Sequence, residues 1–196
     1  GIKGHIKNIT GALNIESNNI EIGTFNNSAT GLRSIAIGAN TTASNTDAIA
    51  MGENTTATGI SSTAIGKATN ANADGATSMG NGTTASGVNS TSMGVNTLAS
   101  GNHSTAMGNG TVASGTNSIS GGSSTTAGGN QSFAVGFSTT ANGTVATAMG
   151  NSTVASGTSA TAMGLYSVAS GVAATATGYD TEASGANSTA MGKETT

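Results

Sequence analysis

The amino-acid sequence predicts an all-β protein: a parallel β-roll, or β-solenoid, in which each coil is a 14-residue repeat. Three observations support this prediction. Glycine recurs at a constant spacing, alanine recurs at a fixed offset from each glycine, and the chain contains 31 Gly but no Pro, Cys or Trp. Self-similarity at a fixed period is typical of a stacked repeat architecture, in which each unit buries its surface against the next.

The repeat is defined by a glycine at every fourteenth position. These glycines are Gly38, Gly52, Gly66, Gly80, Gly94, Gly108, Gly122, Gly136, Gly150, Gly164, Gly178 and Gly192. Alanine or serine stands two residues before each of them, and alanine stands five residues after each, up to Ala183. A second glycine usually follows after seven residues, so each unit divides into two similar halves. About twelve units in register predict about twelve coils.

Each half of the repeat has the pattern expected of a short strand followed by a turn. Serine or threonine and alanine alternate with their neighbours, which is strand periodicity, and the glycine with two variable residues indicates the turn. A period of seven also suggests a coiled coil. That alternative fails because each half contains a helix-destabilising glycine and lacks the paired large apolar residues of a helical seam.

The two halves differ at the residue before the glycine. In the first half this residue is large and apolar in most units: Ile37, Met51, Ile65, Met79, Met93, Met107, Val135, Met149, Met163 and Met191, with Gly121 and Thr177 interrupting the row. In the second half it is polar, as at Ser100 and Ser114. Strand alternation places both rows outside, opposite the alanines.

An apolar row along the whole rod predicts an oligomer, because long apolar patches are rarely left in water. The inside of a lone roll would contain little more than alanine methyls, whereas burial of the row would add about 1.5–3 kcal/mol per large side chain. The alternative, with Met and Ile inside and alanine outside, would crowd every level of the roll.

Three strings of residues resemble a known family. Asn187-Ser-Thr-Ala-Met-Gly192, His103-Ser-Thr-Ala-Met-Gly108 and Ser34-Ile-Ala-Ile-Gly38 are similar to the head repeats of YadA-like trimeric autotransporter adhesins. The resemblance covers about residues 31–192. It implies a left-handed β-roll, a homotrimer whose apolar row faces the trimer axis, and exposure on the bacterial cell surface outside the outer membrane. Binding to host extracellular matrix, such as collagen, fibronectin or laminin, or to host cell receptors is implied as well.

The ends of the chain differ from the repeat. Residues 1–22 are out of register, so we expect residues 1–30 to form an atypical N-terminal cap with a partial coil, and residues 31–196 to form the repetitive head. The chain starts at Gly1 and stops partway into a further repeat, so we expect it to be part of a longer protein. Membrane anchoring would then depend on segments outside this chain.

Large residues follow the turn glycine in three units. Phe137, Leu165 and Tyr179 share this position, with Tyr166 beside Leu165. We expect them along one edge of the rod, where they are candidates for ligand contact or for packing between subunits.

The sequence gives no sign of an enzyme. It contains two histidines, His5 and His103, neither of which recurs in the repeat, and too few aspartates for a calcium-binding repeat. We therefore predict no catalytic residue, metal or cofactor. A net charge of −3 without a basic run disfavours nucleic-acid binding. An adhesive head is the leading hypothesis. A passive spacer that displays another domain remains open, and an ice-binding solenoid is disfavoured because no regular outward Thr pair recurs.

Overall fold

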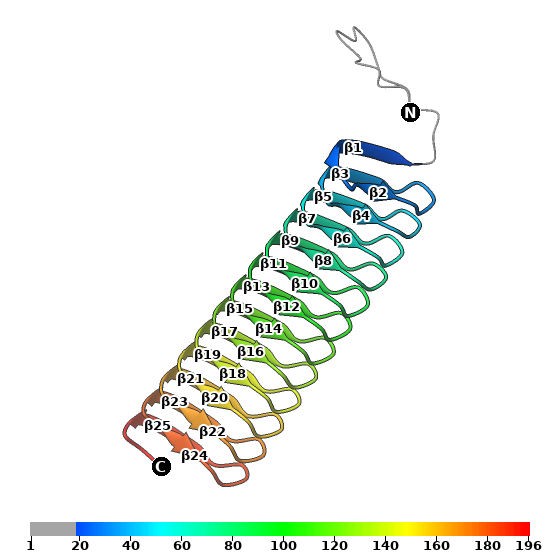
Figure 1. The fold of residues 1–196 in the computed structure, drawn as a ribbon. Helices are drawn as coiled ribbons and strands as arrows, with labels where there is room; N and C mark the ends of the chain where they lie inside the picture. Colours follow the sequence, from blue (N-terminus) through cyan, green and yellow to red (C-terminus); the bar gives the residue numbers. More distant parts are fainter. Residues whose placement is uncertain (1–18) are drawn as a thin grey trace, which may run out of the picture.

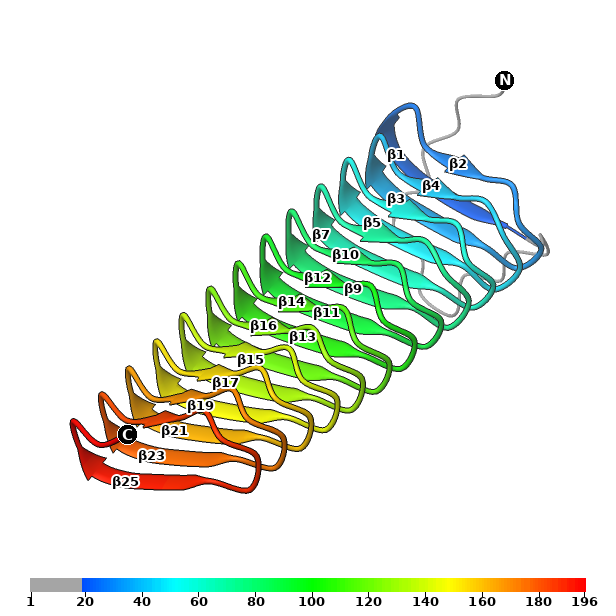
Figure 2. The same ribbon diagram turned by 90° about the horizontal axis from the view of Figure 1, so that it is seen from below.

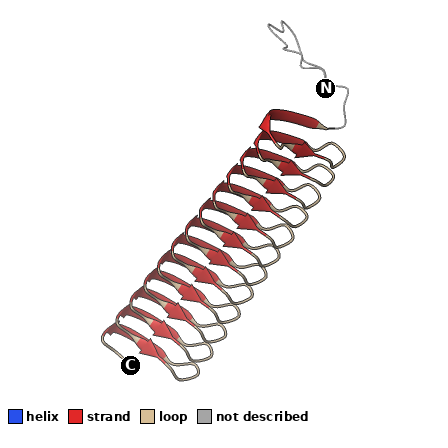
Figure 3. Cartoon of the chain, viewed as in Figure 1, coloured by secondary structure: helices blue, strands red, loops and turns tan. Residues whose placement is uncertain are grey.

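The computed structural model describes residues 19–196. The chain winds into a straight, flattened rod whose two long faces are parallel β-sheets (Figure 1). Strands and the turns between them alternate along the whole rod (Figure 3). No helix long and apolar enough to cross a membrane occurs within residues 19–196. The predicted fold class, an all-β parallel solenoid of 14-residue coils, is confirmed.

One face of the rod is a sheet of thirteen strands. They are β1 (Ile20–Phe25), β3 (Ile35–Ala39), β5 (Ile49–Glu53), β7 (Thr63–Lys67), β9 (Thr77–Asn81), β11 (Thr91–Val95), β13 (Thr105–Asn109), β15 (Ile119–Ser123), β17 (Phe133–Phe137), β19 (Thr147–Asn151), β21 (Thr161–Leu165), β23 (Thr175–Tyr179) and β25 (Thr189–Lys193).

The other face is a sheet of twelve two-residue strands. They are β2 (Ser28–Ala29), β4 (Thr42–Ala43), β6 (Thr56–Ala57), β8 (Asn70–Ala71), β10 (Thr84–Ala85), β12 (Leu98–Ala99), β14 (Val112–Ala113), β16 (Thr126–Ala127), β18 (Thr140–Ala141), β20 (Val154–Ala155), β22 (Val168–Ala169) and β24 (Glu182–Ala183).

From β3 onward each coil stacks on the next with a register of 14 residues, so that identical coil positions are neighbours; β1 pairs with β3 in a register of 15 residues up to Gly23. Met79 pairs with Met93 and Met93 with Met107. The turns stack as well, as the 2.8 Å hydrogen bond from the His103 amide to the Val88 carbonyl shows. Figure 2 shows the coils as flattened loops one behind another. Every coil therefore presents the same positions to the same face.

The two halves of a coil are less alike than the sequence suggests. We expected the first glycine of each unit to begin a turn, but Gly94 lies inside β11 and pairs with Gly80 and Gly108. Its φ of +125° is one that glycine adopts readily. The strand therefore continues past the glycine, which makes it five residues long where its counterpart on the other sheet has two.

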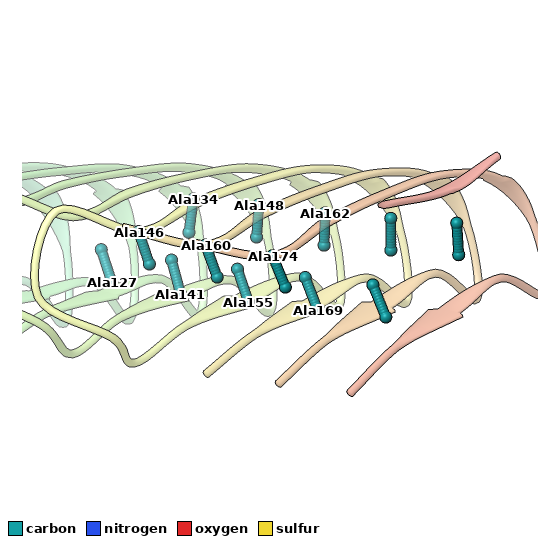
Figure 4. Packing of buried hydrophobic residues seen from close by; sticks show 13 residues of the cluster. Ala127, Ala134, Ala141, Ala146, Ala148, Ala155, Ala160, Ala162, Ala169 and Ala174 are labelled. Atoms are coloured by element: carbon teal, nitrogen blue, oxygen red, sulfur yellow. The ribbon is translucent and has the colours of Figure 1, made fainter. Parts of the chain in front are cut away.

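Alanines from both sheets fill the interior. Figure 4 shows Ala134, Ala148 and Ala162 pointing from the thirteen-stranded sheet towards Ala141 and Ala155 of the opposite sheet. All five are fully buried. The sheets can lie this close together because nothing larger than a methyl group projects from these positions.

Buried hydroxyls share the interior with the alanines. A threonine stands three residues after the first glycine of most coils and is fully buried, as at Thr83, Thr97 and Thr125. In these three coils the residue two before the glycine is serine, and the hydroxyls of Ser and Thr bond across the interior at 2.6–2.8 Å. The hydroxyls of Thr55, Thr69, Thr111, Thr139 and Thr153, whose coils have alanine there, have no hydrogen-bond partner among the described residues.

This difference predicts opposite effects for one substitution at equivalent positions. Thr97→Val would remove the 2.6 Å bond and leave the buried Ser92 hydroxyl without that partner, so we expect a loss of about 1–3 kcal/mol in the free energy of unfolding. Thr139→Val would replace an unbonded buried hydroxyl with a methyl group, and should be neutral or stabilising. Urea-denaturation midpoints measure both, and equal destabilisation would contradict the prediction.

The first described coil is closed by side chains that bond to backbone atoms. Glu21 occupies the interior position of the later alanines, being paired with Ala36, and its Oε1 accepts a 2.7 Å hydrogen bond from the Ala29 amide. Asn27 donates to the Gly38 carbonyl and accepts from the Thr41 hydroxyl. These bonds supply partners at the N-terminal edge of the described rod. Residues 1–18 of the expected cap lie outside the described residues, and the cap stays a prediction.

Candidate functional site: an apolar column and an aromatic edge

The predicted apolar row runs along the outer face of the thirteen-stranded sheet. We call it the Met/Ile column; its members are Ile37, Met51, Ile65, Met79, Met93, Met107, Val135, Met149, Met163 and Met191. Ile65, Met107, Met149 and Met191 are exposed and the others are half-buried, whereas the alanines one residue before Ile37 and Met51 are fully buried. The alternative with Met and Ile inside and alanine outside is therefore wrong. Whether another chain covers the column stays a prediction.

A second column lies two residues earlier on the same face. It is threonine in most coils, but it carries Ile35, Ile49, Ile119 and Phe133 in four of them. Ile119 and Phe133 belong to the coils on either side of the backbone pairing between Gly121 and Val135. Of the four, only Ile119 lies in a coil where the Met/Ile column lacks a large side chain, because Gly121 stands there. Sequence reasoning missed these residues, although strand alternation places them on the same face.

The polar residues of the other half-repeat are also outside. Ser100 and Ser114 are exposed and follow β12 and β14. They belong to the same two coils as Met93 and Met107, so each coil presents a polar and an apolar residue from its two different sheets.

The structure brings together three of the four predicted contact residues. Leu165 pairs with Tyr179 on the neighbouring coil. The rings of Tyr166 and Tyr179 pack edge to face with centroids 6.3 Å apart. Lys193 Nζ lies 5.6 Å from the centre of the Tyr179 ring, within the range of a cation–π contact. We call Leu165, Tyr166, Tyr179 and Lys193 the aromatic edge.

Phe137 does not belong to this cluster. It has the same coil position as Leu165, but Asn151 lies between them in the ladder. Its side chain is 54% exposed and stands apart.

Tyr166 adopts a backbone conformation that is unusual for its type. Its φ is +58°, in the left-handed region, which costs a residue with a side chain about 1–2 kcal/mol. The same position holds Asn, Gly or Ser in most other coils. The conformation leaves the ring half exposed beside Tyr179, so contact with another molecule would involve an aromatic surface that the backbone already presents.

Charged side chains lie near the ends of the described rod. Arg33 makes two hydrogen bonds of 2.6 Å to the Asp47 carboxylate, and hydrogen bonding from Arg33 lowers the pKa of Asp47 below its usual value. Lys67 pairs with Glu53 at 3.2 Å. From Asp74 to Asp180 the sequence contains no further charged residue. Most of the Met/Ile column is therefore electrically neutral, and contacts there depend on apolar packing and hydrogen bonds.

Residues 19–196 contain no group of three or more His, Asp or Glu that could hold a metal ion. His103 lies exposed in a turn, with φ of +57°. The surfaces that stand out are instead extended ones, repeated along the rod.

These features define a β-roll repeat protein whose candidate binding surfaces lie on its outer faces. A family model described as the YadA head domain repeat, in two copies, matches residues 29–55, 57–83, 85–111, 113–139, 141–167 and 169–195. The chain therefore belongs to the YadA head family, and the predicted resemblance is confirmed. Membership makes this an adhesin-type domain and implies a surface-exposed region of an autotransporter adhesin. A comparison with curated proteins found no match.

Proposed function

We propose that this chain is the head of a homotrimeric adhesin, held on the surface of a Gram-negative bacterium, that attaches to host extracellular matrix or host cells. The single observation that carries the proposal is the Met/Ile column, which lies outside a roll whose interior is already filled. Such a column has no use within its own chain.

The direction of the column supports a closed assembly of parallel rods. Its residues pair coil by coil along the rod, as Met79, Met93 and Met107 do. Copies related by rotation about an axis parallel to the rod would therefore bring the same residues together at every level. Three left-handed rolls are proposed from the family to which the chain belongs.

The aromatic edge supplies the proposed adhesive contacts. The aromatic edge presents Tyr166 and Tyr179 at 51% and 42% exposure, and aromatic residues are enriched among those that dominate binding energy. Collagen, fibronectin, laminin or host cell receptors are the proposed ligands. Three heads in one assembly would multiply weak contacts by avidity.

Light scattering on the purified chain tests the proposed assembly. We expect the mass of three chains of 18.5 kDa each. A single-chain mass would overturn the trimer and the meaning given to the column.

Surface-binding assays against collagen, fibronectin, laminin and cultured cells test the adhesive role. We expect the trimer to bind at least one of them, and Tyr166→Ser with Tyr179→Ser to weaken that binding at least tenfold while the trimer mass is kept. The matched control is Ser100→Thr with Ser114→Thr, which changes exposed residues away from the edge. Absence of binding to every surface would favour the passive spacer.

A further inference from the structure

We propose that the methionines of the Met/Ile column are a modification site, at which a peroxide converts thioethers to sulfoxides and thereby releases the chains from one another without unfolding the rolls. This inference rests on the proposed assembly. It concerns how that assembly would respond to an oxidant.

All oxidisable sulfur in the chain is gathered in this column. The sequence has seven methionines and no cysteine, and the seven are Met51, Met79, Met93, Met107, Met149, Met163 and Met191. Each immediately precedes a stacked glycine. A random distribution over the fourteen positions of the repeat would have placed some of them elsewhere.

The interior of the described roll offers a peroxide nothing comparable to attack. Its buried side chains are alanine, serine and threonine, which have no thioether, thiol or indole. Oxidation at the column would therefore leave the packing between the two sheets, and the backbone ladders, as they are. Oxidation of the column would therefore disrupt association between chains without disrupting the fold of each roll.

The chemical step needs only the peroxide. A lone pair of the thioether sulfur attacks one peroxide oxygen, an S–O bond forms, the O–O bond breaks, and the other oxygen leaves as water or an alcohol after a proton shift. Sulfur loses two electrons and the peroxide gains them. The product is a polar sulfoxide in place of a flexible apolar side chain.

Sulfoxides at this position would oppose association. Met79, Met93 and Met107 stand at successive levels of the sheet, so several polar S–O groups would lie in one strip that the assembly buries. Burial of a polar group without a hydrogen-bond partner is unfavourable, and the penalty recurs at each oxidised level in every chain.

Interruptions of the column indicate where oxidation would begin. Met107 pairs with Gly121 on one side, so it lacks a large neighbour there. In the single chain it is 40% exposed. We expect it to react before Met79 and Met93, which are half-buried between methionine or isoleucine neighbours.

The test treats the full chain with increasing hydrogen peroxide. Intact mass and peptide mapping count the added oxygens, about 16 Da per sulfoxide, while light scattering gives the assembly mass and far-UV circular dichroism follows the β-structure. We expect the assembly mass to fall to that of one chain as sulfoxides accumulate, with an unchanged β-spectrum. Methionine sulfoxide reductases should restore the assembly.

A variant with all seven methionines replaced by isoleucine is the matched control. It keeps the column apolar and should remain assembled in peroxide. If that variant does not fold, reductase rescue of the natural chain supplies the same discrimination, because it reverses sulfoxides alone. Persistence of the assembly after full oxidation would overturn the inference, as would loss of the β-spectrum together with the assembly. A chain that is monomeric before any peroxide is added would instead overturn the proposed trimer.

Discussion

Replacing Gly122 with alanine is expected to be among the most damaging single changes in the roll, although this glycine is exposed. A Cβ atom at this position would overlap the carbonyl oxygen of Gly136 on the next coil, and the φ of +113° is unfavourable for any L side chain. Neither atom can move without breaking the backbone ladder. We expect a loss of about 4 kcal/mol or more, the range of severe steric defects.

The neighbouring residue provides a matched control of the same chemical type. A Cβ atom at Gly121 would meet only the Val135 Cγ2 atom, at 3.5 Å, which is ordinary van der Waals contact. Gly121→Ala should therefore change the free energy of unfolding by no more than about 0.5 kcal/mol, or increase it by removing a glycine from a strand.

Thermal and urea unfolding followed by circular dichroism measure both variants. Midpoints are the appropriate quantity, because long repeat arrays need not unfold in a single two-state step. Similar midpoints for the two alanine variants would show that the stacked glycine carbonyls do not restrict this position.

The second large effect is expected from aspartate in the Met/Ile column. Met93→Asp combined with Met107→Asp would place carboxylates at two successive levels of the strip that the proposed trimer would bury. In a trimer six such groups would gather near one axis, and burial of unpaired charges is strongly unfavourable. At pH 7 we expect the assembly to dissociate to chains of 18.5 kDa, or to unfold.

Ser100→Asp combined with Ser114→Asp is the control, because it adds the same charges to the same two coils at exposed positions. We expect the assembly mass and the unfolding midpoint to stay close to those of the natural chain. The column would lose its proposed role if both pairs of substitutions had the same effect, or if neither changed the mass.

The interior of the roll could be predicted from the sequence in part. Strand alternation correctly separated the inward alanines from the outward methionines, because side chains on a strand alternate between its faces. The pairing of Ser92 with Thr97 across the interior was not predicted, since it depends on the distance between the two sheets. The same alternation places Ile119 and Phe133 on the outer face, but their coil position is threonine in most coils, so no regular apolar pattern marks it.

The candidate site, too, could be predicted from the sequence only in part. The column follows from one coil position repeated at constant spacing, so its members could be named before the fold was known. The aromatic edge could be named only in part. Phe137 shares its coil position with Leu165 but stands two levels away. Lys193 has the coil position of Tyr179 one repeat later, so the 14-residue spacing could have placed it beside that ring.

The sequence by itself determined that this protein is a stack of coils, because a constant 14-residue spacing can be satisfied at every unit only when each coil repeats the conformation of the one before it. It also determined which residues share each face. Only the tertiary structure decided that the first glycine of each coil lies within a strand, against the next glycine's carbonyl, and that Glu21 and Asn27 close the first described coil. The physical reason is that the repeat period specifies the face to which a side chain points and the coil in which it lies. These contacts depend instead on how closely two backbones approach.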